Sequence, residues 1–134
     1  NYAGIAFGHA GCAAVHAMAY PLGGVHHIPH GQANQLMFAD VMRKYQEKKP
    51  IGKLNQLEEL LGAELDVEPV FSLENLYKLM DEVLEKDPLH EHGVTADELP
   101  VFAKNVIETQ QRLLGNNYVE LTEDDLLDIY RKAF

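Results

Sequence analysis

Apolar residues recur at helical spacing along this chain, and proline, glycine and helix-capping residues separate the apolar runs. No segment alternates apolar and polar residues with a period of two, and no hairpin turn joins β-branched runs. The positions of these proline, glycine and capping residues predict helices over residues 3–19, 30–48, 52–61, 72–87, 96–114 and 122–134. The sequence therefore predicts an all-α fold, a bundle of helices.

Individual residues predict where these helices begin and end. Pro21 is expected to end the first helix and Gly62 to end the third. Ser72 is expected to cap the fourth helix, and Thr122 to open the last one in a capping box. The apolar face of the fourth helix is expected to be buried, and it comprises Leu73, Leu76, Leu79, Met80 and Val83.

Length and charge narrow the class further. A chain of 134 residues is expected to form one domain, and its single cysteine excludes an internal disulfide and fits a cytoplasmic protein. The net charge of −10 argues against binding nucleic acid. The apolar stretch 2–20 contains His9 and His16, so we expect a buried helix and not a membrane span. The chain opens on Asn1 without a signal peptide, and we expect further residues upstream.

Five of the seven histidines lie between residues 9 and 30. His9 and His16 share one helix face, and Tyr20 follows His16 by one turn. His30 lies at the start of the next helix. Two imidazoles from different helices, here His16 and His30, can begin a metal site. Spacing alone leaves the alternative open that each is a hydrogen-bonded core histidine, because this is no zinc-finger pattern.

Three segments carry a family resemblance. They are residues 4–7 (GIAF), 15–23 (VHAMAYPLG) and 28–34 (IPHGQAN), and residues 90–99 and 121–130 support them. Together they resemble the iron-dependent (group III) alcohol dehydrogenase family over the whole chain. The resemblance implies a two-domain, dehydroquinate synthase-like protein, in which an N-terminal α/β domain binds NAD or NADP. Residues 1–134 would be the C-terminal, metal-binding helical domain, inactive without that N-terminal domain.

The resemblance also implies roles for particular residues. One divalent metal, Fe2+ or Zn2+, is held by an aspartate and three histidines, of which the last two map onto His16 and His30. The chain has Tyr20 where the family often has a histidine near the nicotinamide, so Tyr20 is the expected cofactor contact and proton donor. Phe7 maps onto an apolar wall of the substrate pocket, and His9 could reach a distal polar group of the substrate.

Residues 20–24 and 26–30 are similar to the branch that interconverts 4-hydroxybutyrate and succinate semialdehyde. A carboxylate on the substrate would suit a histidine such as His9 or His27, although His26 and His27 are expected to be solvated. Another small primary alcohol is the alternative substrate, and a homo-oligomer is left open. Outside catalysis, an acidic helical interaction module and a metal carrier are the alternatives. Residues 2–34 contain no Asp or Glu, which disfavours the carrier.

Overall fold

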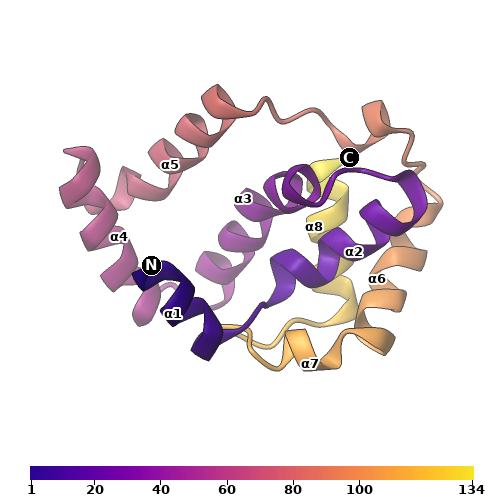
Figure 1. The fold of residues 1–134 in the computed structure, drawn as a ribbon, viewed down its shortest axis with the longest axis horizontal. Coiled ribbons are helices and arrows are strands. Elements are labelled where there is room, and N and C mark those ends of the chain that lie inside the picture. Colours follow the sequence, from indigo (N-terminus) through magenta and orange to yellow (C-terminus); the bar gives the residue numbers. More distant parts are fainter.

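The computed structural model describes residues 1–134, and all of its regular structure is helical (Figure 1). The all-α prediction is confirmed. The elements are α1 (Tyr2–Ala10), α2 (Ala14–His26), α3 (His30–Lys48), α4 (Lys53–Leu65), α5 (Pro69–Val83), the 3-10 helix η1 (Leu89–His92), α6 (Glu98–Thr109), α7 (Gln111–Leu114) and α8 (Glu123–Ala133).

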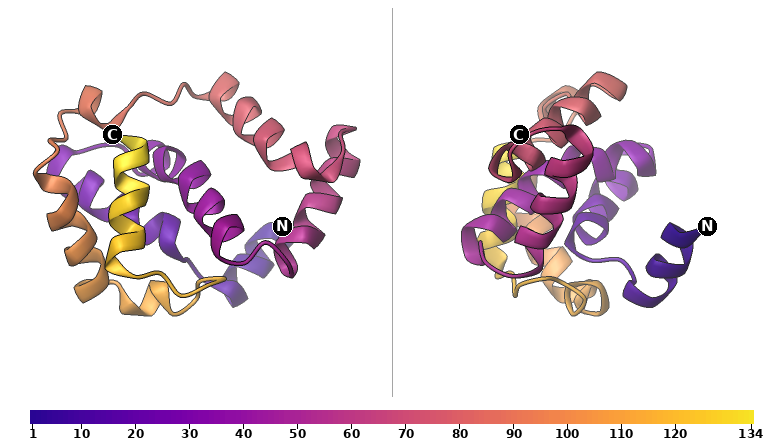
Figure 2. Two further views of the ribbon diagram at one scale, coloured as in Figure 1. Left: turned by 180° about the vertical axis from the view of Figure 1, so that it is seen from behind. Right: turned by 90° about the vertical axis from the view of Figure 1, so that its left-hand side faces the viewer.

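Four helices form the central bundle. Helix α2 packs on α3 and α6, and α8 packs on α3 and α6, while the short α7 lies against α2 and α6. Helices α4 and α5 pack against each other at one side of this bundle, and α1 stands apart from it (Figures 1 and 2). None of the residues of α1 is buried. No helix in the chain is both long and apolar enough to span a bilayer.

The core is one cluster of 27 buried apolar residues drawn mainly from α2, α3, α6 and α8. Helix α8 begins at the predicted capping box, in which the Thr122 hydroxyl accepts a hydrogen bond from the Asp125 amide. Tyr130 on α8 is completely buried, and its hydroxyl donates to the carbonyl of Met18 on α2 over 2.7 Å. Burial raises the pKa of the Tyr130 phenol, which therefore stays protonated and keeps α2 tied to α8.

The first predicted helix, over residues 3–19, is wrong in two ways. The chain breaks at Gly11, which has φ +71°, and Ala13 is extended, so two helices replace one. The second of them continues through Pro21, which is buried, and ends only where His27 adopts the left-handed conformation at φ 56°. Burial of the apolar face of α2, including Leu22, outweighs the hydrogen bond that Pro21 cannot donate.

Other boundaries also differ from the prediction. Gly62 does not end α4, which continues to Leu65. The glycine is instead needed for close packing, because a Cβ at this position would lie 2.9 Å from the carbonyl of Val67 in the turn to α5. Ser72 lies inside α5, where it donates to the carbonyl of Pro69, so it is no cap. The helix predicted over 96–114 is two helices separated at Gln110.

The predicted buried face of α5 is only partly buried. Leu73 is buried, whereas Leu79 is half-exposed and Val83 is 82% exposed. The physical reason is that α5 packs closely only on α4 and meets α3 through side chains alone, such as the hydrogen bond from Gln35 to Asp81. The C-terminal end of α5 therefore keeps apolar side chains in solvent.

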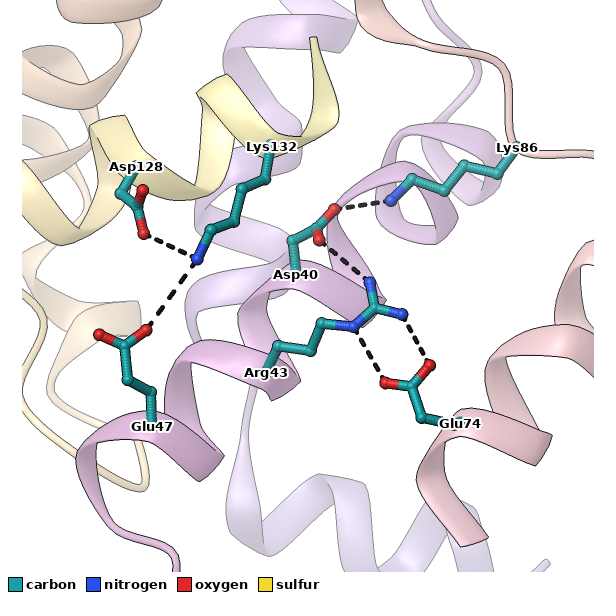
Figure 3. A network of polar contacts seen from close by, with 7 residues as sticks. All are labelled: Asp40, Arg43, Glu47, Glu74, Lys86, Asp128 and Lys132. Atoms are coloured by element: carbon teal, nitrogen blue, oxygen red, sulfur yellow. Dashed lines mark hydrogen bonds and ion pairs between the residues drawn. The ribbon is translucent and has the colours of Figure 1, made fainter. Parts of the chain in front are cut away.

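Ion pairs join α3 to α5 (Figure 3), beside the aromatic contact of Phe38 with Tyr77. Arg43 on α3 forms two hydrogen bonds with the Glu74 carboxylate on α5, at 3.1 and 2.9 Å. Asp40, only 5% exposed, accepts from Arg43 over 3.2 Å and from Lys86 over 2.6 Å. Removing either cation would leave a nearly buried carboxylate less well paired, so this network fixes α5 and the segment after it to the bundle.

Candidate metal and substrate site

The structure brings His16 and His30 together. His16 lies in the first turn of α2, and His30 is the first residue of α3. After α2 ends, residues 27–29 run back toward the start of α3 (Figure 1), and the two imidazole centroids lie 5.3 Å apart with an interplanar angle of 53°. Pro29 precedes α3 with an extended backbone, φ −54° and ψ 139°.

The two rings have the spacing that one divalent cation requires. A metal–nitrogen bond of about 2.0–2.1 Å and a near-tetrahedral angle place two ligating imidazole centroids roughly 5 Å apart. Partial burial, and then the neighbouring His30 ring, lower the pKa of His16, which favours the neutral imidazole that can donate a lone pair. No third His, Cys, Asp or Glu of this chain joins the pair. The donor set therefore fits part of a metal site and not a whole one.

Tyr20 and Asn34 flank the His30 ring. Tyr20 stacks on His30 with centroids 6.4 Å apart and an interplanar angle of 24°. The amide nitrogen of Asn34, one turn along α3, lies 3.0 Å from Nε2 of His30. This contact orients the ring, and a cation bound through Nε2 would have to displace it. The side-chain oxygen of Asn34 is buried without a hydrogen-bond partner.

A cavity of about 310 Å³ adjoins Tyr20. Its size is at the lower end of small-molecule sites. It lies where the end of α1, the start of α2 and α7 meet, and it is lined by Phe7, Gly8, Gly11, Cys12, Tyr20, Arg112, Leu113 and Asn116. The expected pocket residue Phe7 and the expected cofactor contact Tyr20 thus line one cavity, while His9 is exposed on α1 and is not part of its wall.

Two asparagines hold the junction between α1 and α2. Asn116 donates to the carbonyl of Cys12 over 2.9 Å. The side-chain oxygen of Asn117 accepts from the backbone amide of Ala14 over 2.8 Å and from the Tyr45 hydroxyl over 2.9 Å. These bonds fix the start of α2, two residues before the histidine that faces His30. Sequence reasoning missed both asparagines, because only the fold brings a loop about a hundred residues downstream to this junction.

The remaining histidines lie away from the pair. His26 was expected in solvent, but it is half-buried, and its Nε2 lies 3.1 Å from the Glu98 carboxylate, which joins α2 to α6. Two hydrogen bonds from Thr95 and the contact with His26 lower the pKa of Glu98. His27 is exposed, as expected, in its left-handed turn. His90 is exposed and His92 is half-buried in η1, where Nε2 of His92 has no partner.

A helical domain that presents two converging imidazoles beside a small cavity is the kind that supplies part of a metal centre. The chain belongs to the Fe-containing alcohol dehydrogenase family, whose C-terminal model matches residues 1–134. The family resemblance inferred from the motifs is confirmed.

Several known proteins are similar to this chain. It is 45% identical over 134 residues to the 4-hydroxybutyrate dehydrogenase of Clostridium kluyveri, covering 100% of the chain and 36% of that protein. It is 35% identical to long-chain-alcohol dehydrogenase 1 of Geobacillus thermodenitrificans, covering 98% of the chain and 34% of the relative. A crystal structure of 1,3-propanediol oxidoreductase matches with a TM-score of 0.73 and 26% identity, covering 90% of this chain and 32% of that one. The chain thus spans about a third of the length of these proteins.

Proposed function

We propose that this chain is the metal-binding helical domain of a longer, NAD(P)-linked alcohol dehydrogenase that interconverts 4-hydroxybutyrate and succinate semialdehyde. The observation that carries the proposal is the convergence of His16 and His30 at 5.3 Å between ring centroids. The match of the family model to the whole chain supports it independently. The other metal ligands and the dinucleotide site would come from the N-terminal domain of the same protein.

In this proposal His16 and His30 hold a divalent cation, Fe2+ or Zn2+. When bound, such a cation stabilises the negative charge that develops on the substrate oxygen during hydride transfer to the nicotinamide. Neutral imidazole ligands leave the positive charge of the cation uncompensated, which suits that task. The two histidines would hold the cation from the first turns of α2 and α3, which pack on each other.

The neighbouring residues would bind and orient the substrate. Tyr20, stacked on His30 and 43% exposed, can donate a hydrogen bond at the reacting end of the substrate or contact the nicotinamide. Phe7, 55% exposed in this chain, offers an apolar face to the methylene groups of the substrate. His9 is the proposed contact for a polar group at the rim.

The identity of the alcohol is proposed from likeness. The 45% identity over the whole chain to a 4-hydroxybutyrate dehydrogenase supports a four-carbon hydroxy acid. The long-chain-alcohol dehydrogenase and the lactaldehyde reductase of Escherichia coli are less similar to this chain, at 35% and 27% identity. Because these relatives are also similar, another primary alcohol is the alternative substrate. Rates of NAD- and NADP-linked oxidation of 4-hydroxybutyrate, 1,2-propanediol and 1-octanol by the full-length protein would separate these substrates.

The metal assignment is tested on the full-length protein with a matched pair of histidine variants. His30→Asn should remove most of the bound Fe or Zn, measured by elemental analysis, and lower kcat/KM at least about 100-fold. His27→Asn changes an exposed histidine three residues earlier at a left-handed position that asparagine tolerates, and it should keep both metal and rate. Turnover that resists a chelator, or a His30→Asn enzyme with full metal and full activity, would refute the assignment.

A further inference from the structure

Arg112 is a cation without a carboxylate partner at the wall of the cavity beside Tyr20. It lies on α7, which packs against α2 (Figure 1), and the cavity lining contains no Asp or Glu. Six of the eleven lysines and arginines form ion pairs, namely Arg43, Lys44, Lys48, Lys86, Lys104 and Lys132. Arg112 is not among them, although the chain carries 21 acidic residues.

The three arginines of the chain differ in what faces them. Arg43 is paired with Glu74 and Asp40, and the hydrogen bonding of its guanidinium to Glu74 is the largest cause that raises its pKa. Arg131 is exposed on α8 and lines none of the cavities. Arg112 alone faces a cavity of molecular size. Its guanidinium is therefore available to an anion that enters that cavity.

Tyr20 connects the cavity to the candidate metal site, although neither His16 nor His30 lines the cavity. Tyr20 stacks on His30 and also lines the cavity, so a substrate held by its oxygen near the two imidazoles would extend into it. Phe7 supplies an apolar wall and Arg112 a cationic one. A molecule that suits this order of surfaces has a hydroxyl or carbonyl at one end, methylene groups in the middle and an anion at the other end.

We propose that Arg112 binds the terminal carboxylate of an ω-hydroxy acid and thereby makes the enzyme prefer anionic over neutral primary alcohols. This inference rests on the proposed dehydrogenase function and names the residue that sets its substrate class. A guanidinium presents two parallel N–H donors that match a carboxylate, and these charge-assisted bonds are stronger than those of a neutral donor. The proposal assigns to Arg112 the task for which His9 is the alternative, because His9 does not line the cavity.

The test compares full-length variants on a charged and a neutral substrate of similar length. The readout is the ratio of kcat/KM for 4-hydroxybutyrate to kcat/KM for 1,4-butanediol. Arg112→Gln should lower this ratio about 10- to 100-fold, the loss expected for one charged hydrogen-bonding group. Arg112→Lys, which keeps the charge and loses the paired donors, should lower it less. Arg131→Gln removes the same charge from an exposed position and should keep the wild-type ratio. His9→Gln tests the alternative contact and should lower the ratio less than Arg112→Gln does.

A second measurement does not depend on turnover. Butyrate, a carboxylate that cannot be oxidised at carbon 4 by this reaction, is titrated into wild type and variants by calorimetry, and Arg112→Gln should weaken its binding at least tenfold relative to Arg131→Gln. Should the wild type oxidise no alcohol, the proposed function fails, and the butyrate titration still decides whether Arg112 forms a carboxylate site. Equal ratios and equal butyrate binding in the Gln variants, or a loss confined to His9→Gln, would overturn the inference.

Discussion

The hydrogen bonds of Asn117 predict how strongly the candidate site depends on a distant loop. The side-chain oxygen of Asn117 accepts from the Ala14 amide over 2.8 Å and from the Tyr45 hydroxyl over 2.9 Å. Asn117→Ala removes the acceptor and leaves both donors without a partner inside the protein. Each lost bond costs about 1 kcal/mol, and leaving a buried donor unpaired costs about 1–3 kcal/mol. We expect a total of about 2–3 kcal/mol, because Tyr45 is buried and the junction is partly open to water.

Thermal unfolding of the chain measures this loss. For about 134 residues, a loss of 2–3 kcal/mol should lower the midpoint by roughly 6–10 °C. Tyr45→Phe removes one of the two bonds and should cost about 1 kcal/mol. The double variant should lose about 1 kcal/mol less free energy of unfolding than the two single variants together. The reason is that the Tyr45 hydroxyl, which Asn117→Ala would leave without a partner, is then absent. A midpoint within 2 °C of wild type for Asn117→Ala, or strict additivity, would refute the reasoning.

Two further predictions concern stability away from the site. Partial burial opposes ionisation of Asp125, but hydrogen bonds, first from Lys48 and then from the helix cap, lower its pKa below the ordinary 3.8. The pairing therefore stabilises the fold above about pH 4 and is lost as pH falls through the folded pKa, so Asp125→Asn should lower the midpoint at pH 7 and should approach wild type near pH 3. Gly62→Ala should destabilise the chain by about 1–3 kcal/mol in urea titrations, because the new Cβ would lie 2.9 Å from the Val67 carbonyl. Gly24→Ala, in a helix with open space around the position, should stabilise the chain by about 0.5 kcal/mol or more in the same assay.

The sequence predicted correctly those helix boundaries that depend on residues a few positions apart in the chain. Helix α3 begins at His30 and ends at Lys48 as expected, and the capping box at Thr122 forms, because each depends on residues a few positions apart. The breaks at Gly11 and Gln110 could not be read in this way. Gly11 accommodates a side chain from the other end of the chain, since a Cβ there would lie 2.9 Å from the amide of Asn116.

Some residues of the candidate site could be predicted from the sequence, and others only from the structure. The family resemblance pointed to His16 and His30, but the predicted helix over 3–19 placed His16 near a helix end, and only the structure shows the two rings 5.3 Å apart. Arg112 could not be chosen from the sequence, where it is one basic residue in an acidic chain. Its place at the cavity follows from the packing of α7 on α2, which involves residues about a hundred positions apart. Tertiary packing thus selects which charges line this cavity.

The distribution of charge along the chain leads to a last prediction. No Asp or Glu precedes Asp40, so α1, α2 and the first turns of α3 present no carboxylate to the cavity or to the imidazole pair. In the proposed function, an anionic substrate therefore meets no carboxylate on the lining of this cavity, although the chain has a net charge of −10. Asn116→Asp places a carboxylate of nearly the same shape on the cavity wall that carries Arg112. It should lower the preference for 4-hydroxybutyrate over 1,4-butanediol at least about tenfold in the full-length enzyme, because the new charge repels the substrate and pairs with the guanidinium. Asn105→Asp, on the exposed side of α6, adds the same charge and should leave the preference as it is. If both variants kept the wild-type preference, local charge would not govern which alcohols this cavity accepts.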